Sequence, residues 1–426
     1  MQYSEMSKEQ LMQELEKNEA RLEEMKERHL SLDLSRGKPD QAQLNLSMAV
    51  LDALKADSVT DSGNGLDCRN YGALDGIPEA KSLFAEILQT TPEHVFVGGN
   101  SSLTLMFEVM SHAMIDGLLG EAPQIFDAER KFLCPVPGYD RHFGMTEHFG
   151  YKLITVPMKN DGPDMDVVEE LVRKDPSIKG IWCVPKYANP TGVVYSDEVV
   201  RRFARLKPAA RDFRIYWDNA YCVHVLDPEN DQPILDILSE CEKAGNPDMV
   251  YEFTSTSKIS FAGGGVAALA SSPANLIDIK SFMTVATIGY DKLNMLRHVR
   301  YFKNLSGIKN HMAKHAALIR PKFEAVETIL DKELGGLGIA EWTTPAGGYF
   351  ISFNTKAPVA SNVTTLCKEC GVVFTPAGAT FPYGKDPANS NIRIAPTYAV
   401  IDDIKTATEL FAIAVKVETL KNLLGK

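Results

Sequence analysis

The sequence lacks the pattern of a disulfide-bonded or metal-binding protein. Its 426 residues include only 7 cysteines, an odd number that favours free thiols over a disulfide framework. Cys367 and Cys370 form one C-x-x-C pair, but no second pair or histidine cluster follows at zinc-ligand spacing. There is no H-E-x-x-H motif and no acidic calcium loop. We therefore expect no metal site, and we interpret both cysteines as packing residues near a short helix over residues 363–371.

The sequence also lacks long apolar runs and an excess of positive charge. No stretch is long enough to cross a bilayer, and residues 1–17 are charged rather than apolar, which predicts a cytoplasmic protein. The formal net charge of −11 argues against nucleic acid as a partner, because such a partner requires a basic face. We expect neither a membrane nor a nucleic acid among the partners.

The composition that is present is typical of a globular protein, with 44% hydrophobic and 24% charged residues. A chain of 426 residues exceeds what one core usually holds, so more than one domain is expected. We predict an N-terminal helix and arm over residues 1–46, a large domain over 47–291 and a small domain over 292–426. The N-terminal segment either packs on the small domain or reaches a dimer interface, and the sequence leaves both interpretations open.

Short apolar strands alternate with helical periodicity through the first two thirds of the chain. Helices are expected at residues 78–88, 101–118, 165–173 and 196–205, and strands at 94–97, 131–135, 152–157, 180–184, 214–217, 250–254 and 266–270. This alternation predicts an α/β domain of three layers, with a mostly parallel sheet covered on both faces. The mixed pattern after residue 292 predicts a smaller α+β domain. Ligands of such sheets bind beyond the carboxyl ends of the strands.

Hydroxyl and aromatic side chains follow the first two of these strands. Ser101 and Ser102 begin a helix, where hydroxyls and free backbone N–H groups can bind an anion. Tyr139 follows the next strand, and its ring could lie on another flat ring. An ordinary helix cap and a loop-covering aromatic explain the same residues equally well in isolation.

An amide, an acid and a phenol follow two later strands. Asn189 begins an Asn-Pro-Thr-Gly turn and could donate a hydrogen bond to a phenolate oxygen. Asp218, with Tyr221 three residues further on, could hold two edges of one heterocycle, the acid at a ring nitrogen and the phenol at a ring oxygen. A simple turn and an aspartate helix cap remain the alternatives.

Lys258 follows the strand at residues 250–254 and precedes the loose run Ala-Gly-Gly-Gly at 262–265. Such an amine can form a Schiff base if burial or neighbouring charges lower its pKa, and the hydroxyls of Ser255 and Ser257 can hold a phosphate. A solvated lysine in a polar loop is the alternative. Taken together, however, the residues at these strand ends suit pyridoxal phosphate and few other groups.

The order of these motifs resembles the fold-type I pyridoxal-phosphate aminotransferases over nearly the whole chain. Within that group the sequence is most similar to the bacterial class Ic aspartate aminotransferases, which are catalogued beside alanine–glyoxylate aminotransferases. The segments that carry this resemblance are Ser-Arg-Gly-Lys-Pro at 35–39, Asn-Tyr-Gly at 70–72, Gly-Asn-Ser-Ser-Leu at 99–103 and Ser-Thr-Ser-Lys at 255–258. The resemblance implies a homodimer with shared active sites, to which Tyr71 contributes from the partner subunit.

The resemblance also implies a role for each site residue. Lys258 would bind pyridoxal 5'-phosphate and act with Asp218 as a catalytic residue. The cofactor would be bound by Ser101, Ser102, Tyr139, Asn189, Asp218, Tyr221, Ser255, Ser257, Lys258 and Tyr71. Substrate would contact Gly37, Asn189 and Arg393, with the Arg393 guanidinium holding the α-carboxylate through two parallel hydrogen bonds.

The expected reaction is amino transfer between L-aspartate or L-glutamate and a 2-oxo acid by a ping-pong mechanism. Many relatives carry a phosphate-binding arginine shortly after the lysine, but this sequence has Gly-Gly-Gly-Val at 263–266, and Lys186 is one conceivable substitute. Arg36, Arg141, Lys292 and Arg297 are candidates for binding a second substrate carboxylate. The alternatives are a cysteine-type β-lyase reaction on the same cofactor, a regulator-type ligand-binding domain without catalysis, and a plain nucleotide-binding α/β protein.

Overall fold

Eight strands form the central sheet of the larger of two bodies. The computed structural model describes residues 1–426. The strands follow the order β2-β9-β8-β7-β6-β3-β4-β5 across the sheet. Their bounds are β2 (Val95–Val97), β3 (Lys131–Val136), β4 (Lys152–Lys159), β5 (Gly162–Pro163), β6 (Ile178–Cys183), β7 (Arg214–Asp218), β8 (Val250–Ser255) and β9 (Ala267–Ala270). The predicted mostly parallel sheet is confirmed: β4, β3, β6, β7 and β8 are parallel, whereas β9 runs against both of its neighbours.

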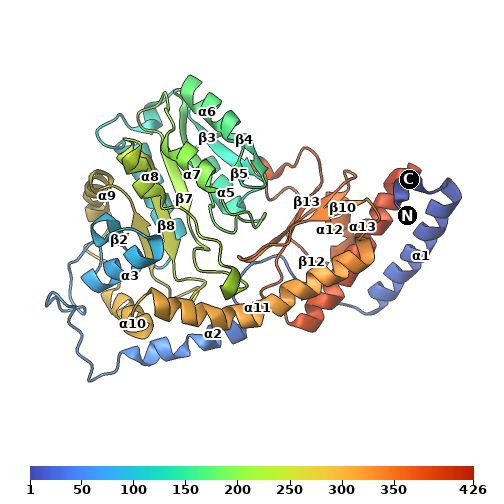
Figure 1. Ribbon diagram of the computed structural model, residues 1–426, viewed down its shortest axis with the longest axis horizontal. Helices are drawn as coiled ribbons and strands as arrows, with labels where there is room; N and C mark the ends of the chain where they lie inside the picture. The colour runs from blue at the N-terminus through green and yellow to red at the C-terminus, as the bar shows by residue number, and fades with distance from the viewer.

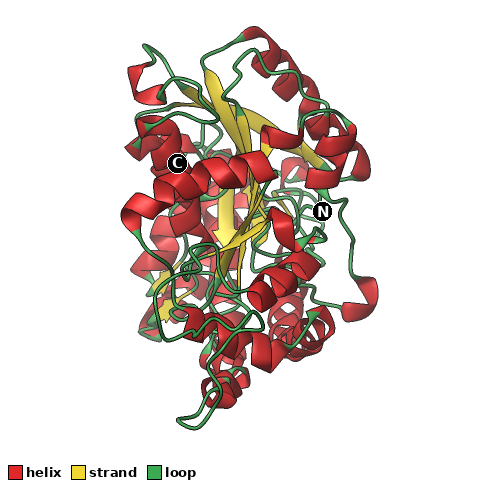
Figure 2. Ribbon diagram, turned by 90° about the vertical axis from the view of Figure 1, so that its left-hand side faces the viewer, coloured by secondary structure: helices red, strands yellow, loops and turns green.

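Helices cover both faces of this sheet, so the larger body has three layers (Figure 2). The covering helices are α3 (Pro78–Leu88), α4 (Ser102–Ile115), α5 (Asp140–His148), α6 (Met165–Lys174), α7 (Asp197–Ala204), α8 (Ile237–Lys243) and α9 (Pro273–Ala286). Alternate residues of strand β7 point to opposite faces of the sheet. Ile215 and Trp217 belong to the core under α3, α6, α7 and α8, and Tyr216 belongs to the core under α4 and α9. The strands are buried on both sides, as a parallel sheet between helix layers requires.

The smaller body contains an antiparallel sheet and several helices. Its sheet has the order β10-β11-β13, with β10 (Ala340–Trp342), β11 (Ile351–Thr355) and β13 (Asn391–Ile394). A separate parallel pair joins β1 (Leu32–Asp33) to β12 (Val372–Val373), so residues near the N-terminus complete this body. Its helices are α12 (Ala360–Glu369) and α13 (Ile401–Leu424). Cys367 and Cys370 are buried in the core of this body.

The N-terminal helix α1 (Lys8–Glu27) packs along α13 (Figure 1). A capping box begins this helix, because Ser7 accepts from the backbone of Gln10 and the Gln10 side chain accepts from the backbone of Ser7. Leu11, Leu15 and Leu22 are buried in the core of the smaller body. Of the two interpretations left open, the structure therefore shows α1 packed on its own chain. The domain boundaries at residues 46 and 291 stay a prediction.

One long helix joins the two bodies (Figure 1). Helix α11 (Leu305–Leu334) contributes Ile308 and Met312 to the core of the larger body. The residues that it contributes to the core of the smaller body lie between Ile319 and Leu334. Helix α10 (Lys292–Phe302) precedes it, and α2 (Gln41–Leu46) lies against it. The remaining short 3-10 helices are η1 (Tyr3–Glu5), η2 (Met48–Ala53), η3 (Pro92–His94), η4 (Gln124–Phe126), η5 (Pro228–Asn230), η6 (Pro247–Met249) and η7 (Pro382–Gly384). None of the helices has both the length and the apolar character needed to span a membrane.

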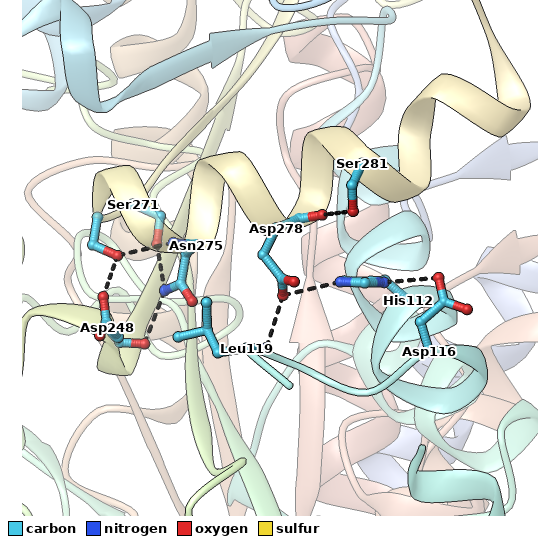
Figure 3. A network of polar contacts seen from close by, with 9 residues as sticks. His112, Asp116, Leu119, Asp248, Ser271, Asn275, Asp278 and Ser281 are labelled. Carbon is cyan, nitrogen blue, oxygen red and sulfur yellow. Dashed lines mark hydrogen bonds and ion pairs between the residues drawn. The ribbon is translucent and has the colours of Figure 1, made fainter. Parts of the chain in front are cut away.

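A polar network fixes α9 against α4 and the sheet (Figure 3). On α4, Nε2 of His112 lies 3.0 Å from Asp278 Oδ2 on α9, and Nδ1 of the same ring lies 3.3 Å from Asp116 Oδ2. The same Asp278 oxygen accepts a hydrogen bond from the backbone N–H of Leu119 at 2.9 Å. At the start of α9, the Asn275 amide donates to the Asp248 carbonyl at 2.8 Å. These polar contacts add to the apolar packing between α4 and α9, and they also connect α9 to the segment that contains Asp248.

Candidate active site

A cavity lies at the carboxyl ends of the parallel strands. Twelve residues line it: Ser101, Ser102, Leu103, Tyr139, Val184, Asn189, Asp218, Ala220, Tyr221, Ser255, Ser257 and Lys258. All of them except Leu103, Val184 and Ala220 are residues that the sequence predicted for cofactor binding. The gathering has a simple cause, because the carboxyl ends of parallel strands meet at one edge of the sheet. The roles of these residues are still predictions, but their shared location is observed.

Lys258 reaches this cavity from a tight turn that follows β8. The turn is closed by Thr256, whose backbone N–H donates to the Val266 carbonyl at 2.8 Å and whose hydroxyl accepts from the Val266 N–H at 2.9 Å. The Lys258 amine lies 4.9 Å from the centre of the Tyr221 ring. Burial raises the pKa of Tyr221 well above its usual value, so its hydroxyl keeps a proton that it can donate. The turn thus presents an amine and a phenol to the same space.

A buried polar network contacts the backbone of this turn. Tyr349 donates to the Lys258 carbonyl at 3.5 Å, and Gln43 donates to the Tyr349 hydroxyl at 3.0 Å. The Gln43 amide also lies 3.2 Å from His315, and His315 lies 3.1 Å from His311. Burial lowers the pKa of His315 to about 4, so this histidine is neutral at pH 7. Because Gln43 precedes Lys258 by more than 200 residues and the histidines lie on α11, sequence reasoning missed this network.

Asp218 ends β7 with one carboxylate oxygen bonded and the other free. Its Oδ2 lies 2.9 Å from Nε2 of His142, and the His142 ring is stacked on Trp182 at 4.3 Å between centres. The other oxygen, Oδ1, is buried and has no hydrogen-bond partner. A buried polar atom left without a partner destabilises a fold by about 1–3 kcal/mol, so it needs a reason. An N–H donor of a bound ligand would satisfy it.

His142 is therefore a site residue that the sequence analysis did not identify. It lies three residues after Tyr139, one turn into α5, and its ring contacts the Tyr139 ring edge-on at 4.9 Å. A histidine spaced by one helical turn from a predicted ring-stacking residue was the signal that could have revealed it. Burial raises the pKa of Tyr139 to about 12, so this phenol is neutral at physiological pH.

Hydroxyl groups and a helix N-terminus form another side of the cavity. Ser101 precedes α4, a helix of 14 residues, and its side chain makes no capping hydrogen bond. Ser255 donates to the Ser257 hydroxyl at 3.1 Å, and Ser257 donates to the Asn100 carbonyl at 2.9 Å. The partial positive charge of a helix N-terminus favours an anion at this position. Free N–H and O–H donors of this kind suit a phosphate.

No arginine lines the cavity, and Lys258 is the only lysine that does. Lys186, suggested by the sequence as a partner for a phosphate, instead pairs with Asp231 at 2.7 Å, so that suggestion is wrong. The pairing has a local reason, because Lys186 sits in the loop after β6, against the segment that contains Asp231. Any phosphate in the cavity is left with the helix N-terminus and hydroxyls of this chain.

Arg393 approaches the cavity from β13 of the smaller body. Its guanidinium lies over the Phe350 ring at 4.8 Å, and Nε donates to the Thr375 hydroxyl at 3.3 Å. Nη1 donates to Asn189 Oδ1, on the cavity wall, at 3.3 Å, and to Asp140 Oδ1 at 3.0 Å. The residue is only 7% exposed. The structure thus brings Arg393 to the predicted Asn189, although 204 residues separate them in the sequence.

The two remaining predicted residues lie outside the cavity wall. Gly37 lies against the Phe350 ring so closely that a Cβ at this position would lie 2.4 Å from Phe350 Cζ. A glycine is needed there, and the contact places Gly37 beside the ring that supports Arg393. Tyr71 is 77% exposed and does not line the cavity of its own chain.

Comparison with known proteins assigns the fold and the family of this chain. The structure matches the α-aminoadipate aminotransferase of Thermus thermophilus with a TM-score of 0.73, over 92% of this chain and 93% of that one, at 20% identity. That likeness concerns the fold alone, which is the fold of the fold-type I aminotransferases. The sequence also matches the aspartate amino-transferase family over residues 6–426.

Matches from Corynebacterium glutamicum are considerably more similar. The chain is 44% identical over 397 residues to an aspartate aminotransferase of that organism, covering 93% of this chain and 91% of the relative. The crystal structure of an aspartate transaminase from C. glutamicum matches with a TM-score of 0.96 and 41% identity over 99% of each chain. The protein belongs to the aspartate aminotransferase family, and it is an aminotransferase that acts on small molecules.

Proposed function

We propose that this aminotransferase uses pyridoxal 5'-phosphate to transfer the amino group between L-aspartate or L-glutamate and a 2-oxo acid. The observation that carries the proposal is the free, buried Oδ1 of Asp218 in the same cavity as the Lys258 amine. A protonated pyridine nitrogen is a donor that would satisfy this oxygen. The remaining wall residues also fit the group: hydroxyls and a helix N-terminus for its phosphate, and the Tyr139 ring for its flat face.

When bound, the cofactor supplies an aldehyde carbon and a ring that withdraws electrons from the substrate Cα. Lys258 would bind that aldehyde before substrate arrives and afterwards act as the base that moves the Cα proton. Asp218, oriented by His142, would keep a proton on the ring nitrogen. Asn189 and Tyr221 would hold the ring oxygen. These roles use side chains that the fold already holds at one cavity.

The substrate α-carboxylate would bind Arg393, whose planar guanidinium suits a carboxylate. Two candidates for a second carboxylate adjoin that arginine: Arg141 follows its partner Asp140, and Arg36 follows Ser35, whose carbonyl accepts from Thr375 at 2.8 Å. Lys292 and Arg297 belong instead to α10, which packs with α3 and η2. We therefore place the second carboxylate at Arg36 or Arg141. The dicarboxylate named for the C. glutamicum relative supports this choice of substrate class.

Kinetics of Arg36→Gln and Arg141→Gln can assign the second carboxylate. The substitution that removes its partner is expected to raise KM for aspartate about tenfold or more while changing KM for alanine little, because alanine has no side-chain carboxylate. Lys292→Gln serves as the control on α10. If neither arginine variant separates aspartate from alanine, the dicarboxylate assignment fails.

The test of the reaction is Lys258→Ala. Removing the amine is expected to lower turnover by about 10⁴-fold or more and to abolish the visible absorbance that a lysine-bound cofactor gives. Lys243→Ala, which removes an exposed lysine of α8, is the control and should change neither. Product release without an added 2-oxo acid would favour β-elimination over transamination. A Lys258→Ala protein that kept turnover and colour would refute the proposal.

The proposal includes a homodimer in which Tyr71 enters the cavity of the partner chain. Tyr71 is exposed, and its loop touches the end of a second exposed apolar segment: Gly72 contacts Gly289, next to Ile288, and Val285 is 89% exposed. The 7 free cysteines favour a reducing compartment, which supports placement in the cytoplasm.

Complementation tests the shared site. Tyr71→Ala and Lys258→Ala chains are each expected to be nearly inactive, but a mixed dimer would contain one site with both native residues. Statistical mixing of equal amounts should then restore about a quarter of the wild-type activity, because half of the dimers are mixed and each has one native site. Mixed samples that stay inactive, or a fully active monomer in solution, would contradict shared sites.

A further inference from the structure

The guanidinium proposed to bind the substrate already holds a carboxylate of its own chain. Asp140 Oδ1 lies 3.0 Å from Arg393 Nη1, and that same nitrogen donates to Asn189 on the cavity wall. Asp140 is the first residue of α5 in the larger body, whereas Arg393 lies on β13 in the smaller one. The ion pair therefore joins the two bodies at the edge of the cavity.

The two partners of this ion pair are held very differently. The Arg393 side chain is 8% exposed and is fixed by the Phe350 ring and the Thr375 hydroxyl. The Asp140 side chain is 39% exposed and forms no other hydrogen bond or ion pair with the chain. If the pair separates, Asp140 can turn into water at little cost, whereas Arg393 stays buried and needs another anion.

We propose that Asp140 competes with the substrate α-carboxylate for Arg393. This inference rests on the role of Arg393 in the proposed function. Without substrate, Asp140 neutralises the buried guanidinium and holds the two bodies together. A substrate carboxylate replaces it, because two carboxylates on one Nη1 nitrogen would repel each other. A substrate carboxylate that makes two parallel hydrogen bonds with the guanidinium competes well with Asp140, which accepts one.

Removing Asp140 changes ligand affinity in opposite directions, depending on whether this residue competes with the substrate or orients Arg393 for it. If Asp140 occupies Arg393 for most of the time, the observed substrate affinity equals the intrinsic affinity multiplied by the fraction of molecules in which Arg393 is free. Removing the competitor should tighten the binding of every carboxylate ligand. If Asp140 instead stays in place and orients Arg393 for substrate, its removal should weaken binding.

The experiment measures binding of succinate, a dicarboxylate that cannot react, to the cofactor-loaded protein by calorimetry. Asp140→Asn keeps the shape of the side chain and removes its charge, and Asp140→Ser is a second variant with the same expectation. Both should bind succinate about 3–10-fold more tightly than wild type and lower KM for the amino acid by a similar factor, with kcat within about twofold. The lowered KM with little change in kcat is the signature of a binding competitor rather than of altered chemistry.

Glu147→Gln provides a matched control. Glu147 lies on the same helix and also bridges to the smaller body, accepting from the Tyr383 N–H at 3.0 Å, but it does not contact Arg393. This variant removes one negative charge of the same helix and should leave succinate affinity unchanged. An equal tightening in Glu147→Gln would show a general charge effect and overturn the proposal.

The failures of the two proposals are distinguishable. Arg393→Gln should lose most succinate binding if Arg393 holds the carboxylate, and wild-type affinity in that variant would refute the role of Arg393. If Arg393→Gln loses binding while both Asp140 variants bind succinate no more tightly than wild type, only the competition is refuted.

Discussion

Two buried histidines of this protein each face an aspartate, and the two pairs differ in one respect. His112 lies 3.0 Å from Asp278, and His142 lies 2.9 Å from Asp218. The Asp278 side chain is 20% exposed, and its bonded oxygen also accepts from a backbone N–H, so its polar atoms are satisfied by the chain or by water (Figure 3). The Asp218 side chain is 6% exposed, and Oδ1 has no partner.

The difference teaches how a structural pair is distinguished from a functional one. Both pairs contain the same groups at nearly the same distance, so the histidine–aspartate contact alone indicates nothing about function. A satisfied pair between two helices stabilises the fold. A pair that leaves a buried oxygen free at the wall of a cavity lowers stability unless a ligand donates to it, and such local violations mark functional sites. Four measurements test whether the two histidine–aspartate pairs differ in function.

Replacing the two aspartates should give opposite phenotypes, and this is the largest expected effect. Asp218→Ala is expected to lower turnover by about 10³-fold or more, because the charge that holds the ring proton is lost. Its stability without cofactor should change little, since a free buried oxygen is removed together with a hydrogen bond. Asp278→Ala should keep the activity but lose about 1–3 kcal/mol of unfolding free energy, because His112 and a backbone N–H lose their partner.

Steady-state kinetics and urea unfolding of the two cofactor-free proteins measure both quantities. The comparison would be broken if Asp278→Ala lost as much activity as Asp218→Ala at equal folded fraction. It would also be broken if Asp218→Ala turned over at the wild-type rate.

Replacing the two histidines should have the same kinds of effect as replacing their aspartates, with a smaller loss of turnover. His142→Phe preserves the stacking on Trp182 but removes the partner of Asp218, so we expect a loss of about 10–100-fold in turnover, the range seen for residues that orient a metal ligand. A change in the pH at which the bound cofactor changes colour would show that the effect acts through the ring. His112→Phe should retain both properties and be less stable instead. An unchanged colour titration in His142→Phe would reduce that residue to a packing role.

A third buried histidine, without an acid partner, gives a pH dependence. The lowered pKa of His315, about 4 against an ordinary 6.5, means that the unfolded chain binds more protons than the folded chain between these values. Stability should therefore fall as the pH falls from about 6.5 to 4, with a contribution of at most about 1.4 kcal/mol per pH unit. Unfolding free energies measured across this range should show a smaller slope in His315→Asn.

The smallest expected effect concerns two serine hydroxyls. Ser101 makes no capping bond and lines the cavity, so Ser101→Ala should weaken cofactor binding by a few fold to about tenfold with little change in stability, the loss expected for one ordinary hydrogen bond. Ser281 bonds only the Asp278 carbonyl in its own helix, and Ser281→Ala should change neither property. Titration of the cofactor-free proteins with pyridoxal phosphate decides. Equal affinities of the two variants would remove Ser101 from the anion site.

The strands and the residues at their ends were largely predictable from the sequence. The expected strand at 214–217 is β7 (Arg214–Asp218), and the one at 250–254 is β8 (Val250–Ser255). Apolar runs bounded by polar residues give such strands directly, and the rule for parallel sheets then places Asp218 and Lys258 at one edge. The antiparallel direction of β9 was not predictable, because an apolar run gives the same signal in either direction.

The supporting contacts were not predictable for a different reason. His142 and Asp218 are 76 residues apart, and Arg393 and Asp140 are 253 apart. Each side chain alone is an ordinary polar residue, with no local pattern that names its partner. Partner choice depends on tertiary packing: His142 and Asp218 meet within the larger body, whereas Arg393 and Asp140 meet only because the two bodies pack against each other.

By itself the sequence determined the alternation of strands and helices, the chemistry offered at each strand end and the family to which the chain belongs, since these depend on local periodicity and on motifs of a few residues. The tertiary structure alone decided which polar atoms are satisfied: it gave His142 to one oxygen of Asp218, left the other oxygen free, and placed Asp140 on Arg393. Hydrogen bonds act only over about 3 Å, so their pairing depends on distances that folding sets.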